Sequence, residues 1–246
     1  MAGALAVHAR GLAKRYGSVT AVEHVDLDVE PGRVMGLLGG NGAGKTTTLA
    51  MLLGLLLPSE GRIEVLGTDM LRHRYRILSH INFSSPYVDL PHRLTVYQNL
   101  RVYAGLYGVR RRDARIRELA RDLDLDDLLE RPYGRLSAGQ RTRASLAKAL
   151  INSPRLLLLD EPTASLDPDT ADRLRGYLKA YQQTQGAAVI LASHNMIEVE
   201  RLCDDVVMLQ AGRVYDRGTP SGLIEKYGRI TLEEVFLDMA RGRTLP

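Results

Sequence analysis

This chain carries the sequence Gly39-Gly40-Asn41-Gly42-Ala43-Gly44-Lys45-Thr46-Thr47 between a short apolar run and a segment with helical periodicity. Its first part, up to Thr46, matches the pattern G-x-x-x-x-G-K-[ST] at every fixed position. Glycines let a backbone curl around an anion, and a helix that starts there adds the positive end of its dipole. Because leucines recur at helical spacing from Lys45 to Leu57 before Pro58, we expect a strand, a phosphate-binding loop and a helix.

Two residues of this loop and an acidic pair farther along the chain indicate nucleotide hydrolysis. Lys45 is expected to bridge the β- and γ-phosphates, and the hydroxyl of Thr46 to bind Mg²⁺. The apolar run Leu156–Leu159 predicts a buried strand, and Asp160-Glu161 follows directly at its carboxyl end. Ligands bind at this end of parallel strands, so Asp160 is expected to hold Mg²⁺ and Glu161 to polarise the attacking water.

Strand and helix patterns alternate through much of the chain. The runs 156–159 and 187–192 are short and continuously apolar, as in strands that are buried on both faces. Between them, a helix is expected to begin after the N-cap Asp167 and to end near Gln185. A hairpin is expected at 206–215. Alternation of this kind predicts an α/β fold with a largely parallel sheet.

The middle of the chain has a different pattern. Helical periodicity occupies residues 95–107, 113–129 and 137–151, with charged residues abundant in the second of these segments. We therefore expect a helical insertion at about 90–150 within the α/β core.

Composition excludes several classes of protein. The chain has 246 residues, a net charge of +4 and a single cysteine, so it has no internal disulfide framework. Its apolar runs, such as 51–57, are far shorter than the ~20 residues that a membrane-spanning helix needs. The positive charge is mild and forms no basic stripe with interleaved aromatic residues, so no nucleic-acid partner is expected.

Three further segments identify a family. Residues 136–140 read Leu-Ser-Ala-Gly-Gln before a helix, Ser165-Leu166-Asp167 follows the acidic pair, and Ser193-His194 follows the second apolar strand. In order and spacing, these segments and the glycine-rich loop resemble the ATP-binding cassette (ABC) ATPases. The resemblance extends from about Leu5 to Thr219.

The resemblance implies a role for each matching residue, with ATP and Mg²⁺ as cofactors. Tyr16 would stack on adenine, and residues 39–47 would hold the triphosphate. His194 would sense the γ-phosphate and help to place the water, so that catalysis would depend on Lys45, Glu161 and His194. Asp167 would lie in a loop at a dimer interface. The γ-phosphate bound by a second subunit would be contacted by a signature formed by Ser137, Ala138, Gly139 and Gln140.

The resemblance also implies the fold: a P-loop NTPase with a RecA-like, mostly parallel sheet, an antiparallel β subdomain and an inserted α-helical subdomain. We assign residues 1–220 to this ATPase domain and residues 221–246 to a C-terminal helical extension. Since one chain carries a phosphate loop and a signature far apart, two copies are expected to form an ATP-dependent head-to-tail dimer around two ATP molecules.

Two residues depart from the family pattern. Ala138 stands where the family usually has glycine, which is a small change beside Ser137 and Gly139. Pro86 stands where the family usually has a glutamine that binds Mg²⁺, and proline has no side-chain oxygen. Ser84 and Ser85 lie beside it and have hydroxyls that could hold a water. We expect water to complete the Mg²⁺ shell here and hydrolysis to be slower or coupled differently.

An ATPase of this kind that does not itself span the membrane needs a partner protein. The segment 231–237 resembles the C-terminal part of ATPase subunits from ABC-2-type exporters, although an ordinary terminal helix folded on the core would show the same amphipathic pattern. We therefore expect a separate membrane permease and a location on the cytoplasmic face of the cell membrane. An importer ATPase, or a soluble ABC ATPase acting on ribosomes or DNA, stays an alternative. This chain is not expected to be a P-loop kinase or a GTPase, because proteins of those classes lack the signature.

Overall fold

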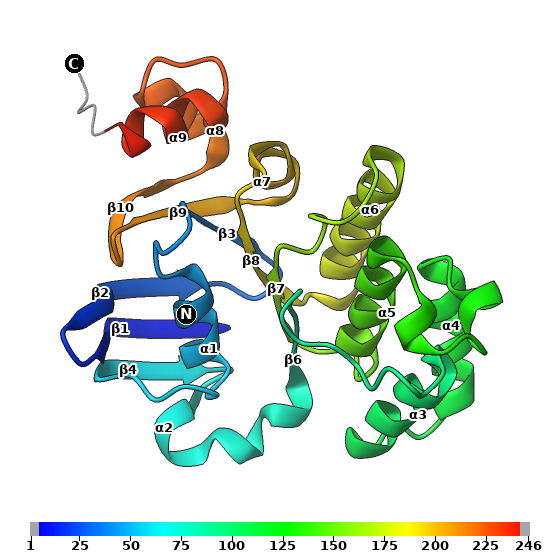
Figure 1. Cartoon of the computed structure of the whole chain (residues 1–246). Coiled ribbons are helices and arrows are strands. Elements are labelled where there is room, and N and C mark those ends of the chain that lie inside the picture. Colours follow the sequence, from blue (N-terminus) through cyan, green and yellow to red (C-terminus); the bar gives the residue numbers. More distant parts are fainter. Residues whose placement is uncertain (1–4, 242–246) are drawn as a thin grey trace.

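Two sheets of different kinds carry the strands of this chain (Figure 1). The computed structural model describes residues 5–241. The smaller, antiparallel sheet has the order β2-β1-β4-β5 and consists of β1 (Val7–Tyr16), β2 (Val19–Val29), β4 (Glu60–Val65) and β5 (Thr68–Asp69). The larger sheet has the order β10-β9-β3-β8-β7-β6 and consists of β3 (Val34–Leu38), β6 (Ile81–Ser84), β7 (Leu156–Asp160), β8 (Ala188–Ser193), β9 (Asp205–Gln210) and β10 (Arg213–Gly218).

The larger sheet is parallel except for its edge strand β10, which forms a hairpin with β9. Its central strands are buried on both faces, which explains their continuous apolar sequences. Along β7, Leu157 and Leu159 join one apolar core, while Leu156 and Leu158 join the other. The predicted P-loop type of α/β fold, with an antiparallel subdomain, is therefore confirmed.

The helical insertion lies between β6 and β7. It contains α3 (Val96–Leu106), α4 (Arg112–Asp122) and α5 (Ala138–Leu150), and it forms a lobe at the right of Figure 1. Before β6 the chain forms α2 (Met70–His73) and the short 3₁₀ helices η1 (Arg74–Arg76) and η2 (Leu78–His80); two further 3₁₀ turns, η3 (Asp126–Leu128) and η4 (Tyr133–Arg135), lie within the insertion.

Two predicted helices end earlier than expected. Helix α1 spans Lys45–Leu52, not 45–57, because Gly54 takes a left-handed conformation (φ +67°) well before Pro58. Helix α4 ends at Asp122, not at 129. There Nη1 of Arg143 donates to the carbonyls of Leu123 and Asp124, and Asp124 takes a positive φ. The Arg143 side chain, from α5, thus donates the hydrogen bonds that the N–H groups of a further turn of α4 would have donated to these carbonyls.

The last part of the chain covers one face of the larger sheet. It contains α6 (Pro168–Gln185), α7 (Met196–Leu202), α8 (Pro220–Lys226) and α9 (Leu232–Ala240). The expected amphipathic face of the terminal helix packs on the core: Leu232 and Val235 are fully buried and Phe236 is partly buried. The division into residues 1–220 and 221–246 stays a prediction. Within residues 5–241, no helix combines the length and the apolar composition needed to span a membrane.

A buried lysine joins the helical lobe to the sheet. Lys148, on α5, is 5% exposed; its Nζ donates to the carbonyl of Phe83 (2.8 Å) and lies over the rings of Phe83 and Tyr103. Because burial removes water from the ammonium, the pKa of Lys148 falls from 10.5 to about 8.

This burial predicts how stability depends on pH. Between pH 8 and 10.5 the unfolded chain binds a proton at Lys148 that the folded chain lacks, so the free energy of unfolding should rise with pH. Relative to Lys148→Met, the rise should reach about 3 kcal/mol. Urea unfolding at a series of pH values measures it, with the exposed Lys226→Met as control. Parallel curves for the native chain and Lys148→Met would contradict the prediction.

Candidate active site

The glycine-rich loop connects β3 to α1 and requires glycine at two positions. Gly44 caps α1 with φ +100°, and a Cβ there would lie 2.7 Å from the carbonyl oxygen of Ala21. A Cβ on Gly39 would lie 2.6 Å from the carbonyl oxygen of Leu209. Both contacts are too close for any side chain, so the loop keeps its bend at the start of α1. This geometry suits an anion at the helix N-terminus.

Lys45 is positioned within the loop itself. Its Nζ donates to the carbonyls of Gly39 (2.7 Å) and Gly40 (3.2 Å), and the residue is only 8% exposed. An ammonium held between loop carbonyls at a helix N-terminus creates a strongly positive point that fits a polyphosphate. The structure therefore places the predicted phosphate-binding lysine where the loop and the helix dipole meet.

Asp160 is the last residue of β7, and its carboxylate accepts hydrogen bonds from hydroxyl groups of two other segments. Its Oδ2 accepts hydrogen bonds from Oγ1 of Thr46 (3.2 Å) and from Oγ of Ser85 (3.3 Å). Burial raises the pKa of this carboxyl group, which the two hydroxyls partly offset. One carboxylate beside a hydroxyl is the kind of oxygen set that Mg²⁺ uses when substrate phosphates complete its shell, so the residues present fit this ion.

Glu161 and His194 meet at the ends of adjacent strands. Nδ1 of His194 lies 2.6 Å from Oε1 of Glu161. The backbone of Glu161 has φ +50°, which is uncommon for a non-glycine residue, and its N–H donates to the carbonyl of Ala192 (2.8 Å). The pairing of β7 with β8 thus holds the carboxylate and the imidazole together, although they are far apart in sequence.

Behind this pair lie Ser193, which the sequence left without a role of its own, and Glu198, which sequence reasoning missed. Oγ of Ser193 donates to Oε2 of Glu198 (2.6 Å) and lies 3.5 Å from Oε2 of Glu161. Glu198 is completely buried on α7, and burial raises its pKa. Its position in the first turn of a helix that follows His194 was the only sequence signal. The chain of contacts connects Glu161 to a buried acid.

The expected signature occupies the start of α5. Ser137 is the N-cap, and it forms a reciprocal capping box with Gln140. Ala138 follows Ser137 on the surface, and a Cβ on Gly139 would lie 3.1 Å from the carbonyl oxygen of Ser165. The serine therefore caps the helix, as any N-cap would, while the helix N-terminus stays exposed to a possible anion.

The remaining predicted residues lie outside this group. Asp167 is exposed and caps α6 by accepting a hydrogen bond from the N–H of Thr170 (3.0 Å). Tyr16 ends β1 in the antiparallel sheet and is 50% exposed, with Nζ of Lys14 5.2 Å from its ring centre. The exposed Tyr16 ring at this end of β1 is available for stacking.

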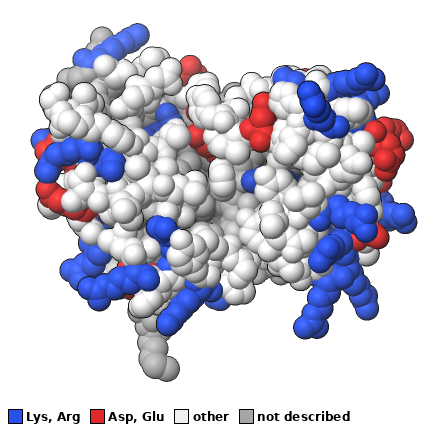
Figure 2. Space-filling model, turned by 60° about the horizontal axis from the view of Figure 1, so that its bottom comes forward, with Lys and Arg blue, Asp and Glu red and all other residues white. Residues whose placement is uncertain are grey.

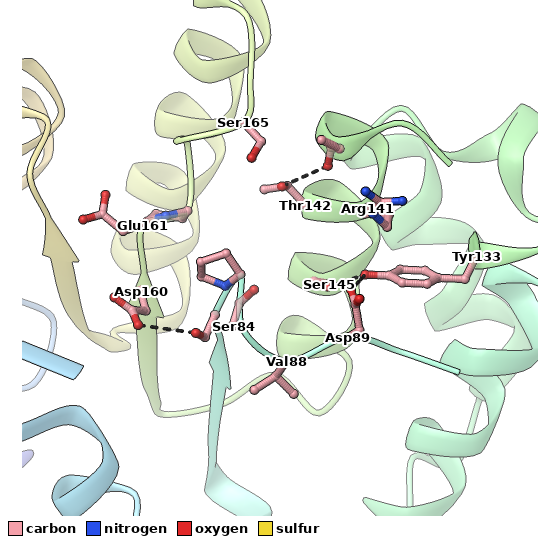
Figure 3. Close-up of a pocket in the computed structure, with 14 residues that line it drawn as sticks. Ser84, Val88, Asp89, Tyr133, Arg141, Thr142, Ser145, Asp160, Glu161 and Ser165 are labelled. Atoms are coloured by element: carbon pink, nitrogen blue, oxygen red, sulfur yellow. Dashed lines mark hydrogen bonds between the residues drawn. The ribbon is translucent and has the colours of Figure 1, made fainter. Parts of the chain in front are cut away.

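A cavity of about 170 Å³ lies between the acidic pair and the helical lobe. Asp160 and Glu161 form one side, and Tyr133 and Arg141 lie on the other (Figure 3). Pro86 also lines this cavity. The lobe thus faces the acidic pair across a polar space.

The structure brings together part of the predicted set. Lys45, Thr46, Asp160, Glu161 and His194 gather at the carboxyl ends of β3, β7 and β8. Of the signature, Ala138 lines the cavity that Asp160 and Glu161 also line, but the start of α5 does not reach the phosphate loop, since α1 and α5 lie on opposite sides of β6 and β7 in Figure 1. One chain therefore holds a phosphate loop with an acidic pair, and a separate exposed helix N-terminus.

Comparisons with known proteins agree with this arrangement. A family model described as ABC transporter matches residues 22–164. The Nod factor export ATP-binding protein I of Ralstonia nicotianae is 36% identical over 237 residues, which is 93% of this chain and 71% of the relative.

Two solved structures have the same fold. A structure of the ATP-binding subunit of an ABC transporter has a TM-score of 0.87 and 27% identity, and the match covers 96% of this chain and all of the other. A dimeric, post-hydrolysis ATP-binding cassette bound to ADP and Pi has a TM-score of 0.79 and 22% identity, over 87% and 98% of the two chains. From the family match, the relative and the site geometry, the chain belongs to the ABC transporter family and is an ATP-binding protein and ATPase of that family.

Proposed function

We propose that this chain is the ATP-hydrolysing subunit of an ABC-2-type exporter and drives a separate membrane-spanning subunit from the cytoplasmic face of the membrane. The observation that carries the hydrolytic part is the contact of Glu161 with His194 beside Asp160 and the phosphate loop. The exporter part is supported by the name of the Nod factor export relative.

Each of the site residues has its own role in binding or hydrolysing ATP. The loop and Lys45 bind and orient the triphosphate, and Thr46 and Asp160 would hold Mg²⁺. The ion, when bound, offsets phosphate charge. Glu161 is placed to orient a water and accept its proton, and His194, hydrogen-bonded to that carboxylate, keeps it aimed. Tyr16 would stack on the adenine ring.

A second copy of the chain would complete each site. Ser137, Ala138, Gly139 and Gln140 form a helix N-terminus that is exposed at Ser137 and Ala138 and that α5 holds away from α1 of the same chain (Figure 1). Two copies related by a two-fold axis would each offer this end to the triphosphate of the other, with Asp167 near the interface. The existence of a dimeric cassette of the same fold supports this arrangement.

One face of the chain suits a protein partner. Apolar side chains are exposed on η1 (Tyr75), after β6 (Tyr87, Val88) and on α3 (Val102, Leu106). Of these elements, η1 and α3 lie in the lower part of Figure 1, and Figure 2, which turns the bottom of that view forward, shows uncharged surface between groups of Lys and Arg. Exposed apolar surface with a charged border is typical of an interaction site. We assign it to the membrane subunit.

Co-expression with a multi-span membrane protein, sought in the neighbouring reading frames, tests the proposal. The two should co-purify in detergent, and ATP turnover should change when the membrane protein is present in lipid vesicles. Transport of substrate toward the side of the vesicle membrane that carries this chain would indicate an importer. Recovery with ribosomes or DNA, and not with the membrane protein, would contradict the proposal.

A further inference from the structure

Ser85 lies beside Asp160 because of the register of two parallel strands. β6 pairs with β7, and Ser84 is opposite Leu159. The next residue of each strand is therefore Ser85 on one side and Asp160 on the other. The Ser85 hydroxyl reaches the carboxylate, with 3.3 Å between Oγ and Oδ2. The register of β6 with β7 therefore brings this hydroxyl, one residue beyond the end of β6, next to the carboxylate.

Pro86 restricts the residue before it. A proline ring disfavours helical conformations of the preceding residue, which favours an extended backbone for Ser85 directly after β6. A further weak hydrogen bond, from the N–H of Tyr87 to Oγ of Ser85 (3.4 Å), closes the turn after the proline. Pro86 therefore removes one possible side-chain oxygen and, at the same time, holds the neighbouring hydroxyl in place.

The hydroxyl has the right chemistry for the ion expected here. A serine hydroxyl has one donor and two acceptor lone pairs, so it can donate to Asp160 and still bind a water. Mg²⁺ gives up its waters reluctantly and is held by few protein oxygens, so residues that fix its waters affect its affinity. Thr46 and Ser85 both contact Oδ2 of Asp160, from α1 and from the end of β6, so three oxygens converge.

We propose that Ser85 is a positioning residue of the Mg²⁺·ATP site: together with Asp160 it holds a water of the metal shell, in place of the oxygen that Pro86 lacks. The proposal rests on the proposed function, since it requires this site to bind nucleotide with metal. It assigns to the segment after β6 a role that the sequence left open.

The test measures metal dependence of binding in place of turnover. In a Glu161→Gln background, a fluorescent ATP analogue is titrated over a series of Mg²⁺ concentrations and also in EDTA. Ser85→Ala should need about tenfold more Mg²⁺ for half-maximal binding, a typical cost of losing an outer-shell partner. Its affinity in EDTA should be unchanged. Ser84→Ala, the same change one residue earlier, should match the background in both conditions.

A shape-matched pair separates the hydroxyl from packing. Ser85→Thr keeps the hydroxyl and should retain the original Mg²⁺ requirement. Valine has nearly the same shape as threonine but no hydroxyl, so Ser85→Val should behave like Ser85→Ala. The inference is overturned if Ser85→Val and Ser85→Thr show the same Mg²⁺ dependence, or if Ser85→Ala weakens binding equally in EDTA. If the background protein binds no ATP analogue at all, the proposed function fails, and not this role of Ser85 alone.

Discussion

Glu161→Gln is expected to lower the rate of ATP hydrolysis by about 10³-fold, within the range that a general base contributes. The amide has the size of the carboxylate and can still contact Nδ1 of His194, which lies 2.6 Å from Oε1 in the native chain. It cannot accept a proton from water. Release of phosphate at saturating ATP and Mg²⁺ measures the effect.

The same substitution should leave ATP binding intact. Glu118→Gln, on the exposed side of α4, is the matched control and should hydrolyse ATP at the native rate. A Glu161→Gln protein that hydrolyses ATP within a few fold of the native rate would show that another group takes the proton. It would remove the role that we assign to Glu161.

Lys45→Ala is expected to be the second most damaging change, with a loss of about 10²- to 10³-fold in ATP turnover, as when one preorganised donor to developing charge is removed. The native ammonium lies inside the loop, 2.7 Å from the carbonyl oxygen of Gly39. Without it, the loop keeps its N–H groups but loses its positive charge. Turnover and binding of a fluorescent ATP analogue, measured together, report the loss.

A control separates this effect from unfolding. Lys226→Ala removes an ammonium that pairs with Asp216 on the surface, and it should leave both turnover and binding unchanged. Thermal melting of Lys45→Ala should stay close to that of the native chain. Native turnover by folded Lys45→Ala would mean that nucleotide binds elsewhere.

Much of the fold follows from local patterns in the sequence. The buried strands β7 and β8 are continuous apolar runs, and α6 begins after Asp167, as its N-cap and Pro168 predict. Helix ends were less predictable where tertiary contacts decide them. Arg143 takes the carbonyls that would have extended α4, and no local pattern indicates a contact between α5 and the end of α4.

The site divides in the same way. Lys45, Asp160 and Glu161 belong to motifs whose chemistry can be deduced from neighbours in sequence. Ser85 and Glu198 could not be assigned, because their contacts depend on the register of β6 with β7 and on how α7 packs behind β8. A serine beside a proline and a glutamate in a short helix are common in loops and surfaces. Only their positions in the folded chain give them partners.

The central claim is that the triphosphate bound by one chain is contacted by the Ser137 region of another, and cross-linking tests it directly. Asn41, in the phosphate loop, and Ser137 are both exposed, and Cys203 is buried. A Glu161→Gln protein that also carries Asn41→Cys and Ser137→Cys is incubated with ATP and Mg²⁺ under mild oxidation. We predict a disulfide-linked dimer that forms with ATP and not without it. Monomers alone, with ATP bound, would contradict the account.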